Sequence, residues 1–239
     1  MASRRQKAIG WTRENILKGV LCGLIALFIG INLQNYCKHE FNTQHIERST
    51  VVIQNESGQL VGTGFIVSNQ GHVMTADHVI RAFWDPKANK LRPIYVRAIG
   101  HPPIRVTPVA NNSFLDMSLL YSEKLSNFDY LDIVTSEHVK AGDKIYVVGH
   151  PNGATWSHSD GIVSRKSFVR TQYGTAYIIF ITAWIDFGNS GGPVVNSDGD
   201  VICMVVAFLG PKNPFSSSVS RHTNLCVPGT EMIRLMETR

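Results

Sequence analysis

Residues 186–193 read Asp186-Phe187-Gly188-Asn189-Ser190-Gly191-Gly192-Pro193, and they place one serine among three glycines just before Val194 and Val195. Glycine lets the backbone adopt angles that other residues resist and lets it approach a bound ligand closely. A serine in such a turn can present its hydroxyl beside backbone N–H groups that bind a developing negative oxygen. The alternative is an ordinary glycine-rich turn with a solvated serine. A base and an orienting acid elsewhere in the chain would decide between the two.

Two other stretches supply candidates for this base and this acid. His78 stands in Thr75-Ala76-Asp77-His78-Val79, directly after an expected strand, and another strand that two glycines open precedes it. Asp116 stands between apolar neighbours. A carboxylate that is buried there needs hydrogen-bond donors, and an imidazole N–H is a suitable donor. Taken singly, a structural histidine and a turn-capping aspartate are the alternatives.

From Ser49 onward the chain consists of short apolar runs that are rich in β-branched residues and bounded by Gly, Asn, Pro and Asp. This pattern predicts strands, and close turns between them predict hairpins. About a dozen strands followed by one helix over Thr230–Thr238 indicate two small antiparallel barrels or a sandwich, with a polar seam at about 122–143. The predicted strands are Thr50–Gln54, Leu60–Val67, His72–Thr75, Ile94–Ile99, Ile104–Val109, Ser118–Tyr121, Lys144–Val148, Gly161–Arg165, Ala176–Ile181, Gly192–Val195, Val201–Phe208 and Asn224–Val227.

His78, Asp116 and Ser190 occur in this order, and the sequence around each resembles the trypsin-like serine peptidases. The resemblance is greatest to the high-temperature-requirement (HtrA/Deg-like) branch, without its PDZ domain, because only thirteen residues follow Cys226. It covers roughly residues 50–238 and implies an all-β, chymotrypsin-like fold of two six-stranded antiparallel β-barrels with a C-terminal helix. The matching stretches are Gly62–Ile66, Thr75–Val79, Asp116–Leu120, Gly149–Gly153, Asp160–Ser164 and Gly188–Asn196.

The resemblance also implies a role for each residue of this set. Ser190 would be the nucleophile, His78 the general base and acid, and Asp116 the group that holds the imidazole in the required tautomer. The backbone N–H groups of Gly188 and Ser190 would form the oxyanion hole. The substrate would be a protein or peptide, and the chemistry needs no metal or organic cofactor.

The specificity pocket departs from the family pattern. The family usually has Asn-Pro before Gly-Asn-Ser, where this chain has Asp186-Phe187, and Trp184 stands at the position of the pocket floor. A bulky indole there predicts small or medium apolar P1 residues. Asp186 is expected either to attract a basic substrate group or to satisfy N–H groups of its own loop. The pocket candidates are Trp184, Asp186, Phe187, Val206 and Ala207.

The N-terminal region predicts a membrane anchor. Residues 1–18 are polar and basic, and Gly19 to Ile31 contains no charge; counted from Ile16 to Leu33 the apolar segment has eighteen residues. We expect an uncleaved signal anchor over residues 19–37, in membrane contact through residues 19–33, and a polar linker over 38–48 before a peptidase domain at 49–239. Five basic residues precede the segment, so the positive-inside rule directs residues 38–239 out of the cytoplasm. A secreted product after signal cleavage and a buried helix of a soluble protein are the alternatives.

Charge and cysteines exclude other functional classes. Residues 1–37 carry five basic and one acidic side chain of the total of 23 and 18, so the remainder carries 18 and 17 and has no excess of positive charge for nucleic acid. The sequence contains no CxxC motif and no Cys/His cluster of the kind that binds zinc. Cys203 and Cys226 are expected either to form a disulfide or to remain buried thiols.

The sequence therefore predicts a membrane-tethered serine endopeptidase that acts outside the cytoplasm. A catalytically inactive relative that binds peptides or proteins on the same scaffold is the main alternative. A structural β-rich membrane protein with a chance motif is the third interpretation.

Overall fold

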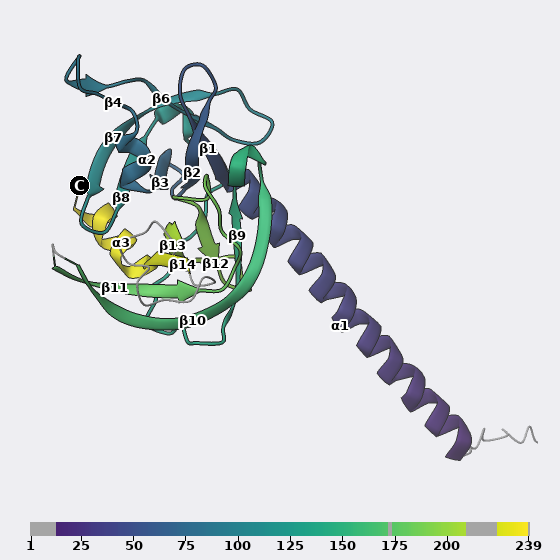
Figure 1. The fold of residues 1–239 in the computed structure, drawn as a ribbon. Helices are drawn as coiled ribbons and strands as arrows, with labels where there is room; N and C mark the ends of the chain where they lie inside the picture. Colours follow the sequence, from purple (N-terminus) through teal and green to yellow (C-terminus); the bar gives the residue numbers. More distant parts are fainter. Residues whose placement is uncertain (1–12, 172–173, 209–223, 239) are drawn as a thin grey trace, which may run out of the picture. The chain divides into compact units, whose positions relative to one another are not determined.

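The computed structural model describes residues 13–171, 174–208 and 224–238, and their side chains except those of 13–16, 33–42, 171, 207 and 208. The chain divides into two compact units, residues 1–41 and 42–239 (Figure 1).

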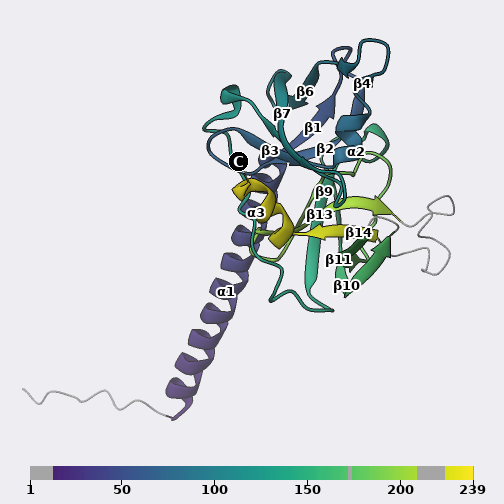
Figure 2. The same ribbon diagram turned by 90° about the vertical axis from the view of Figure 1, so that its left-hand side faces the viewer.

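Helix α1 (Arg13–Ser49) begins in the N-terminal unit and ends in the C-terminal one (Figure 2). Its described apolar side chains from Leu17 to Ile31 are exposed. Within the part of the chain that the structure describes, no helix has both the length and the apolar character to cross a membrane. The expected linker at 38–48 is helical, and its last turns hold Ile46 buried and Glu47 paired with His158.

Six strands of the C-terminal unit form a closed barrel in the order β1-β2-β3-β8-β7-β6. The short helix α2 (Asp77–Arg81) follows β3, and the hairpin of β4 (Trp84–Asp85) and β5 (Lys90–Leu91) comes next. The barrel strands are β1 (Thr50–Gln54), β2 (Leu60–Ile66), β3 (His72–Thr75), β6 (Ile94–Arg97), β7 (Ile104–Asn112) and β8 (Met117–Tyr121).

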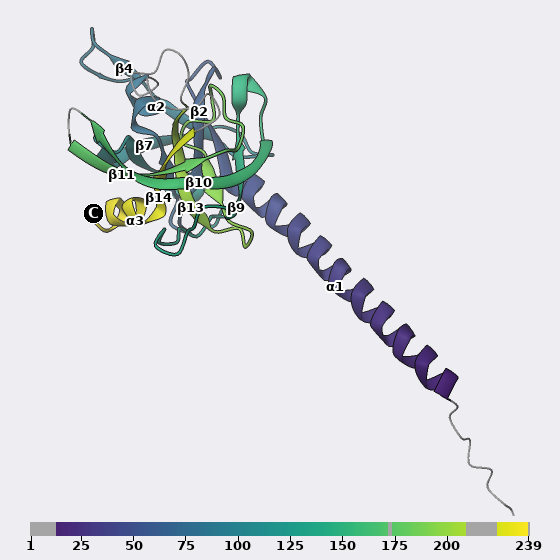
Figure 3. The same cartoon turned by 60° about the horizontal axis from the view of Figure 1, so that its bottom comes forward.

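The second set of six strands pairs in the order β10-β11-β14-β13-β12-β9, and β9 pairs in turn with β10. Two residue pairs join β12 to β9. Its longest strand, β10, curves along both β9 and β11 (Figure 3). The strands are β9 (Lys144–Gly149), β10 (Ser157–Thr171), β11 (Gly174–Ile181), β12 (Pro193–Val195), β13 (Val201–Phe208) and β14 (Asn224–Pro228). The helix α3 (Gly229–Glu237) follows β14. Two short 3-10 helices, η1 (Glu123–Leu125) and η2 (Pro151–Gly153), lie in the connections.

The alternation of side chains along the strands builds the core. On β3, Val73 lies in the core of the first barrel, whereas Met74 lies in a cluster shared with second-barrel residues such as Met204 and with Met232 of α3. Leu120 and Leu119 on β8 divide in the same way. Successive residues of a strand point to opposite faces, so β3 and β8 each fill their own barrel and also join it to the other.

The predicted strands agree with the structure within a few residues, with one exception. The prediction at Gly161–Arg165 covers only the middle of β10. The residues of β10 on either side are mostly polar or charged, so they lack the apolar run by which the other strands were predicted. The β4–β5 hairpin is also absent from the prediction. Its strands are two residues long, which is too short for a periodic signal.

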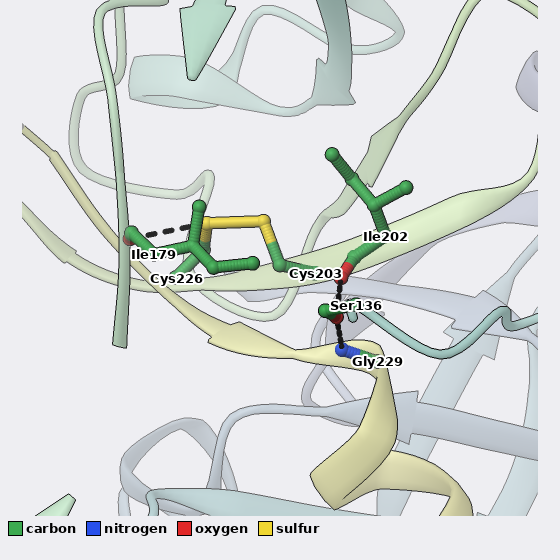
Figure 4. The surroundings of a disulfide bond; sticks show 6 residues. All are labelled: Ser136, Ile179, Ile202, Cys203, Cys226 and Gly229. Carbon is green, nitrogen blue, oxygen red and sulfur yellow. Dashed lines mark hydrogen bonds between the residues drawn. A yellow bond between two sulfur atoms is a disulfide. The ribbon is translucent and has the colours of Figure 1, made fainter. Parts of the chain in front are cut away.

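The connection between the barrels is fastened to the second barrel by Ser136 (Figure 4). The Ser136 hydroxyl donates to the carbonyl of Ile202 at 2.7 Å and accepts the N–H of Gly229 at 2.8 Å. The Ser136 N–H donates to Thr230 Oγ1 at 2.9 Å. These bonds link the start of α3 to β13 and to the seam.

Cys203 of β13 and Cys226 of β14 form a disulfide, with their Cα atoms 5.6 Å apart (Figure 4). Both residues are fully buried. The sequence leaves open a disulfide or two buried thiols, and the structure shows the disulfide.

Candidate active site

His78 and Asp116 meet where two neighbouring strands end and begin. Strands β3 and β8 pair through Thr75 and Ser118, so the residues just after β3 lie beside those just before β8. The His78 N–H donates to Asp116 Oδ1 at 2.8 Å, and His78 Nδ1 lies 2.6 Å from Asp116 Oδ2. An ionised carboxylate only accepts hydrogen bonds, so Nδ1 carries the proton and Nε2 is left as the basic nitrogen of a neutral ring.

Asp77 and Arg81 surround this pair, and the sequence motifs did not single them out. Buried Asp77 accepts a hydrogen bond from the Ser118 hydroxyl at 2.9 Å and pairs with Arg81 Nε at 3.2 Å. Arg81 Nη2 lies 3.7 Å from Asp116 Oδ1. The spacing of four residues between Asp77 and Arg81 on a helix was the available signal.

Ser190 is held against the first barrel by its backbone. Its carbonyl accepts the Thr63 N–H of β2 at 2.9 Å. A Cβ on Gly62 would lie 2.7 Å from Val79 Cγ2 and 3.2 Å from the Ser190 carbonyl oxygen, so the serine and the first turn of α2 meet across this glycine. Among the described residues, no hydrogen bond joins the Ser190 hydroxyl to His78; such bonds are often long in unliganded sites.

The loop before Ser190 has the conformation that its glycines allow. Gly188 has φ of 102°, and a Cβ there would lie 2.3 Å from the carbonyl oxygen of His150. The Phe187 carbonyl accepts the Asn152 N–H at 2.7 Å. The Gly188 carbonyl accepts the Thr63 hydroxyl at 2.6 Å. In the described part of the chain, the N–H groups of Gly188 and Ser190 donate to no acceptor. N–H groups that bind a substrate oxygen must be free in this way.

The expected pocket residues divide into loop anchors and exposed side chains. The carboxylate of Asp186 accepts the Phe187 N–H at 2.8 Å and the Asn152 side-chain amide at 2.7 Å, so it serves its own loop. The side chains of Trp184 and Phe187 are 59% and 70% exposed. Val206 is half-buried, and the side chain of Ala207 lies outside the described residues. Over the same described residues, no cluster of three or more His, Cys, Asp or Glu side chains could hold a metal.

A family model for the trypsin-like peptidase domain matches residues 62–204, which include His78, Asp116 and Ser190. The chain belongs to this family. The match confirms the resemblance that the sequence motifs carry. It also begins at Gly62, the glycine on which the serine and α2 meet.

Several relatives in this family are named as proteases. A probable periplasmic serine endoprotease DegP-like from Pseudomonas putida (strain GB-1) is 32% identical over 165 residues, which is 68% of this chain and 32% of that protein. The magnetosome formation protease MamE of Paramagnetospirillum magneticum is 30% identical over 158 residues, 65% of this chain and 21% of that protein. The chain thus spans about a third or less of the length of these relatives.

Solved protease structures share the fold. The HtrA-type protease AlgW with a tripeptide superposes with a TM-score of 0.69 at 20% identity, over 84% of this chain and 62% of that one. The Rv3671c protease in an inactive form superposes with a TM-score of 0.65 at 21% identity, over 82% and 91%. The mostly β, chymotrypsin-like fold with its C-terminal helix is therefore the fold of this chain.

Proposed function

We propose that this chain is a serine endopeptidase that hydrolyses peptide bonds through Ser190, His78 and Asp116. The observation that carries the proposal is the 2.6 Å bond from His78 Nδ1 to Asp116, which leaves Nε2 as the base of a side chain that is 42% exposed. Ser190, seated across Gly62 from the turn that bears His78, supports the same assignment.

The mechanism follows from these positions. The Ser190 oxygen attacks the carbonyl carbon of the scissile bond while its proton passes to His78 Nε2, and Asp116 stabilises the imidazolium that forms. The oxygen of the tetrahedral intermediate accepts hydrogen bonds from the N–H groups of Gly188 and Ser190. His78 then gives its proton to the leaving amine as the C–N bond breaks, and an acyl-enzyme remains. Water, deprotonated by His78, releases the acid and restores the serine.

Hydrolysis of casein and of a quenched peptide library by the full chain tests this proposal. We expect cleavage by the wild type and by the Ser57→Ala control, whose serine lies exposed in the β1–β2 turn, and no cleavage by Ser190→Ala. Peptide binding without turnover in the wild type would contradict the endopeptidase and favour the inactive, peptide-binding alternative. The library also reads the P1 preference, for which we propose small or medium apolar side chains.

We propose further that the chain acts outside the cytoplasm and is held to a membrane by residues 19–33. The disulfide between Cys203 and Cys226 is typical of oxidising compartments. The exposed apolar side chains between Leu17 and Ile31 support contact with lipid. The periplasmic relatives support the same location.

Fractionation of cells that carry the full chain with a tag at each end tests this location. We expect both tags in the membrane fraction after alkaline carbonate extraction and only the C-terminal tag accessible from outside the cytoplasm. A Leu24→Arg variant should leave the membrane fraction. Recovery of the wild type as a soluble cytoplasmic protein would contradict the proposal, and loss of the N-terminal tag alone would favour signal cleavage.

A further inference from the structure

A buried histidine lies directly behind the loop that precedes Ser190. The side chain of His150, which follows β9, has no exposure to solvent. Its Nδ1 lies 2.9 Å from the hydroxyl oxygen of Thr63, and that hydroxyl lies 2.6 Å from the carbonyl oxygen of Gly188. His150, Thr63 and Gly188 therefore form one chain of hydrogen bonds from the second barrel, through β2, to the loop.

The direction of each bond in this chain follows from the groups themselves. A carbonyl oxygen only accepts, so the single Thr63 hydroxyl proton is donated to Gly188. The remaining bond at the hydroxyl oxygen must then be donated by His150, and its Nδ1 carries the proton. His150 is accordingly a neutral imidazole with a bare Nε2.

The surroundings of the ring favour this neutral form. His150 Nε2 is buried and finds no partner among the described residues. The ring packs against Trp156 in a T-shaped arrangement, with centroids 5.2 Å apart and planes at 80°. Burial lowers the pKa of His150 to about 3, with a smaller contribution from the positive charge of Arg97. The ring therefore remains a fixed donor at any pH near neutrality.

We propose that His150 is a positioning residue of residues 186–190, here called the oxyanion loop. His150 holds the Thr63 hydroxyl so that this hydroxyl fixes the Gly188 carbonyl, and through that carbonyl the Gly188 and Ser190 N–H groups. This inference rests on the proposed peptidase function. The other anchors of the loop come from backbone groups or from Asp186, which accepts the Phe187 N–H and the side-chain amide of Asn152. The Gly188 carbonyl, in contrast, is held by a hydroxyl that can rotate. Gly188 has φ of 102°, and because glycine restricts its own backbone little, this conformation depends on the groups that hold it.

Peptide hydrolysis by the full chain tests this arrangement. We expect Thr63→Val and His150→Leu each to lower kcat by about tenfold or more with little change in KM, since complete loss of one oxyanion donor costs about 10²–10³-fold. Thr63→Ser retains the hydroxyl, and His150→Asn retains a side-chain N–H at the Nδ1 position. Both variants should therefore keep kcat near the wild-type value. The Thr63→Val/His150→Leu double variant should lose no more than Thr63→Val alone. Losses that multiply, or an unchanged kcat in His150→Leu, would overturn the proposal.

Long-range ¹H–¹⁵N NMR of the labelled full chain tests the same bonds without catalysis. We expect the His150 spectrum of a neutral, Nδ1-protonated ring at pH 7, and a perturbed tautomer in Thr63→Val. An Nε2-protonated ring would overturn the proposal even in an active enzyme. If the tautomer is as expected but the wild type cleaves no peptide, the peptidase function fails and the positioning of the loop stands. Thermal unfolding of each variant confirms that it is folded.

Discussion

His78 can act as a base only while its proton stays on Nδ1, and Asp116 holds it there. The carboxylate accepts two bonds from the same residue, one from the backbone N–H and one from the ring. Asp116 also adopts a left-handed conformation with φ of 57°, which its turn imposes and which Asn tolerates as well as Asp does. A substitution by Asn therefore tests the charge and the acceptor without disturbing the backbone.

We expect Asp116→Asn to lower kcat at pH 7 by about 10³–10⁴-fold, because the amide can donate to Nδ1 and stabilise the wrong tautomer. The folded structure should be retained, as judged by thermal unfolding. Asp160→Asn, at an exposed position of β10, is the control and should keep full activity. Equal activity of the two variants would remove Asp116 from the mechanism.

His150 makes stability depend on pH in a definite direction. Its pKa is lowered by burial to about 3 in the folded chain, from 6.5 for the free side chain. Between these values the unfolded chain binds a proton that the folded chain does not, so the free energy of unfolding falls as the pH falls from 6.5 toward 3. Well above pH 6.5 this contribution to stability is fully present.

Urea unfolding of the wild type and of His150→Asn at several pH values measures this effect. We expect the wild type to lose about 3 kcal/mol more than the variant between about pH 6.5 and about pH 4, because only the wild type has this titrating group. The other ionisable groups are common to both chains and cancel in the comparison. Parallel pH profiles would show that His150 titrates normally in the folded state.

At the scale of secondary-structure elements, the sequence predicts much of the fold because the strands are β-branched runs separated by turn residues. The order of His78, Asp116 and Ser190 was likewise predictable, since each lies in a local motif. The network behind the oxyanion loop was not. Thr63 and Gly188 are 125 positions apart in the sequence, and only the packing of β2 against the loop brings them together.

Gly191 is the position where this packing is tightest. It has φ of 84°, and a Cβ there would lie 2.2 Å from the Thr63 carbonyl oxygen. Gly142 has a similar φ of 93°, but a Cβ there would meet no described atom within 4 Å. The two glycines therefore separate conformational strain from steric collision.

We expect Gly142→Ala to destabilise the chain by about 1 kcal/mol, which is the cost of placing alanine at positive φ. Gly191→Ala should cost clearly more and abolish peptide hydrolysis, because the loop must move away from β2 and take Ser190 with it. Urea unfolding and casein hydrolysis of both variants give the comparison. Equal stability and activity of the two would show that the contact between the loop and β2 is not tight.

At the scale of the whole molecule, the peptidase unit is held together by a shared core and by one covalent link. The disulfide between Cys203 and Cys226 joins residues 23 positions apart and closes a loop that includes the described ends of β13 and β14. A loop of this length is expected to contribute about 3 kcal/mol by restricting the unfolded chain.

The Cys203→Ser/Cys226→Ser double variant should therefore lose about 3 kcal/mol of unfolding free energy in urea. A reducing agent should have the same effect on the wild type and none on the variant. A wild type that is insensitive to reduction would show that the disulfide contributes little to stability.

The central claim is that Ser190 is a nucleophile activated by His78. Intact-mass analysis of the full chain after reaction with a fluorophosphonate tests it most directly. Our account predicts one covalent adduct in the wild type, mapped to Ser190, a much slower adduct in His78→Ala, and none in Ser190→Ala. No adduct in the wild type, or the same adduct in Ser190→Ala, would contradict it.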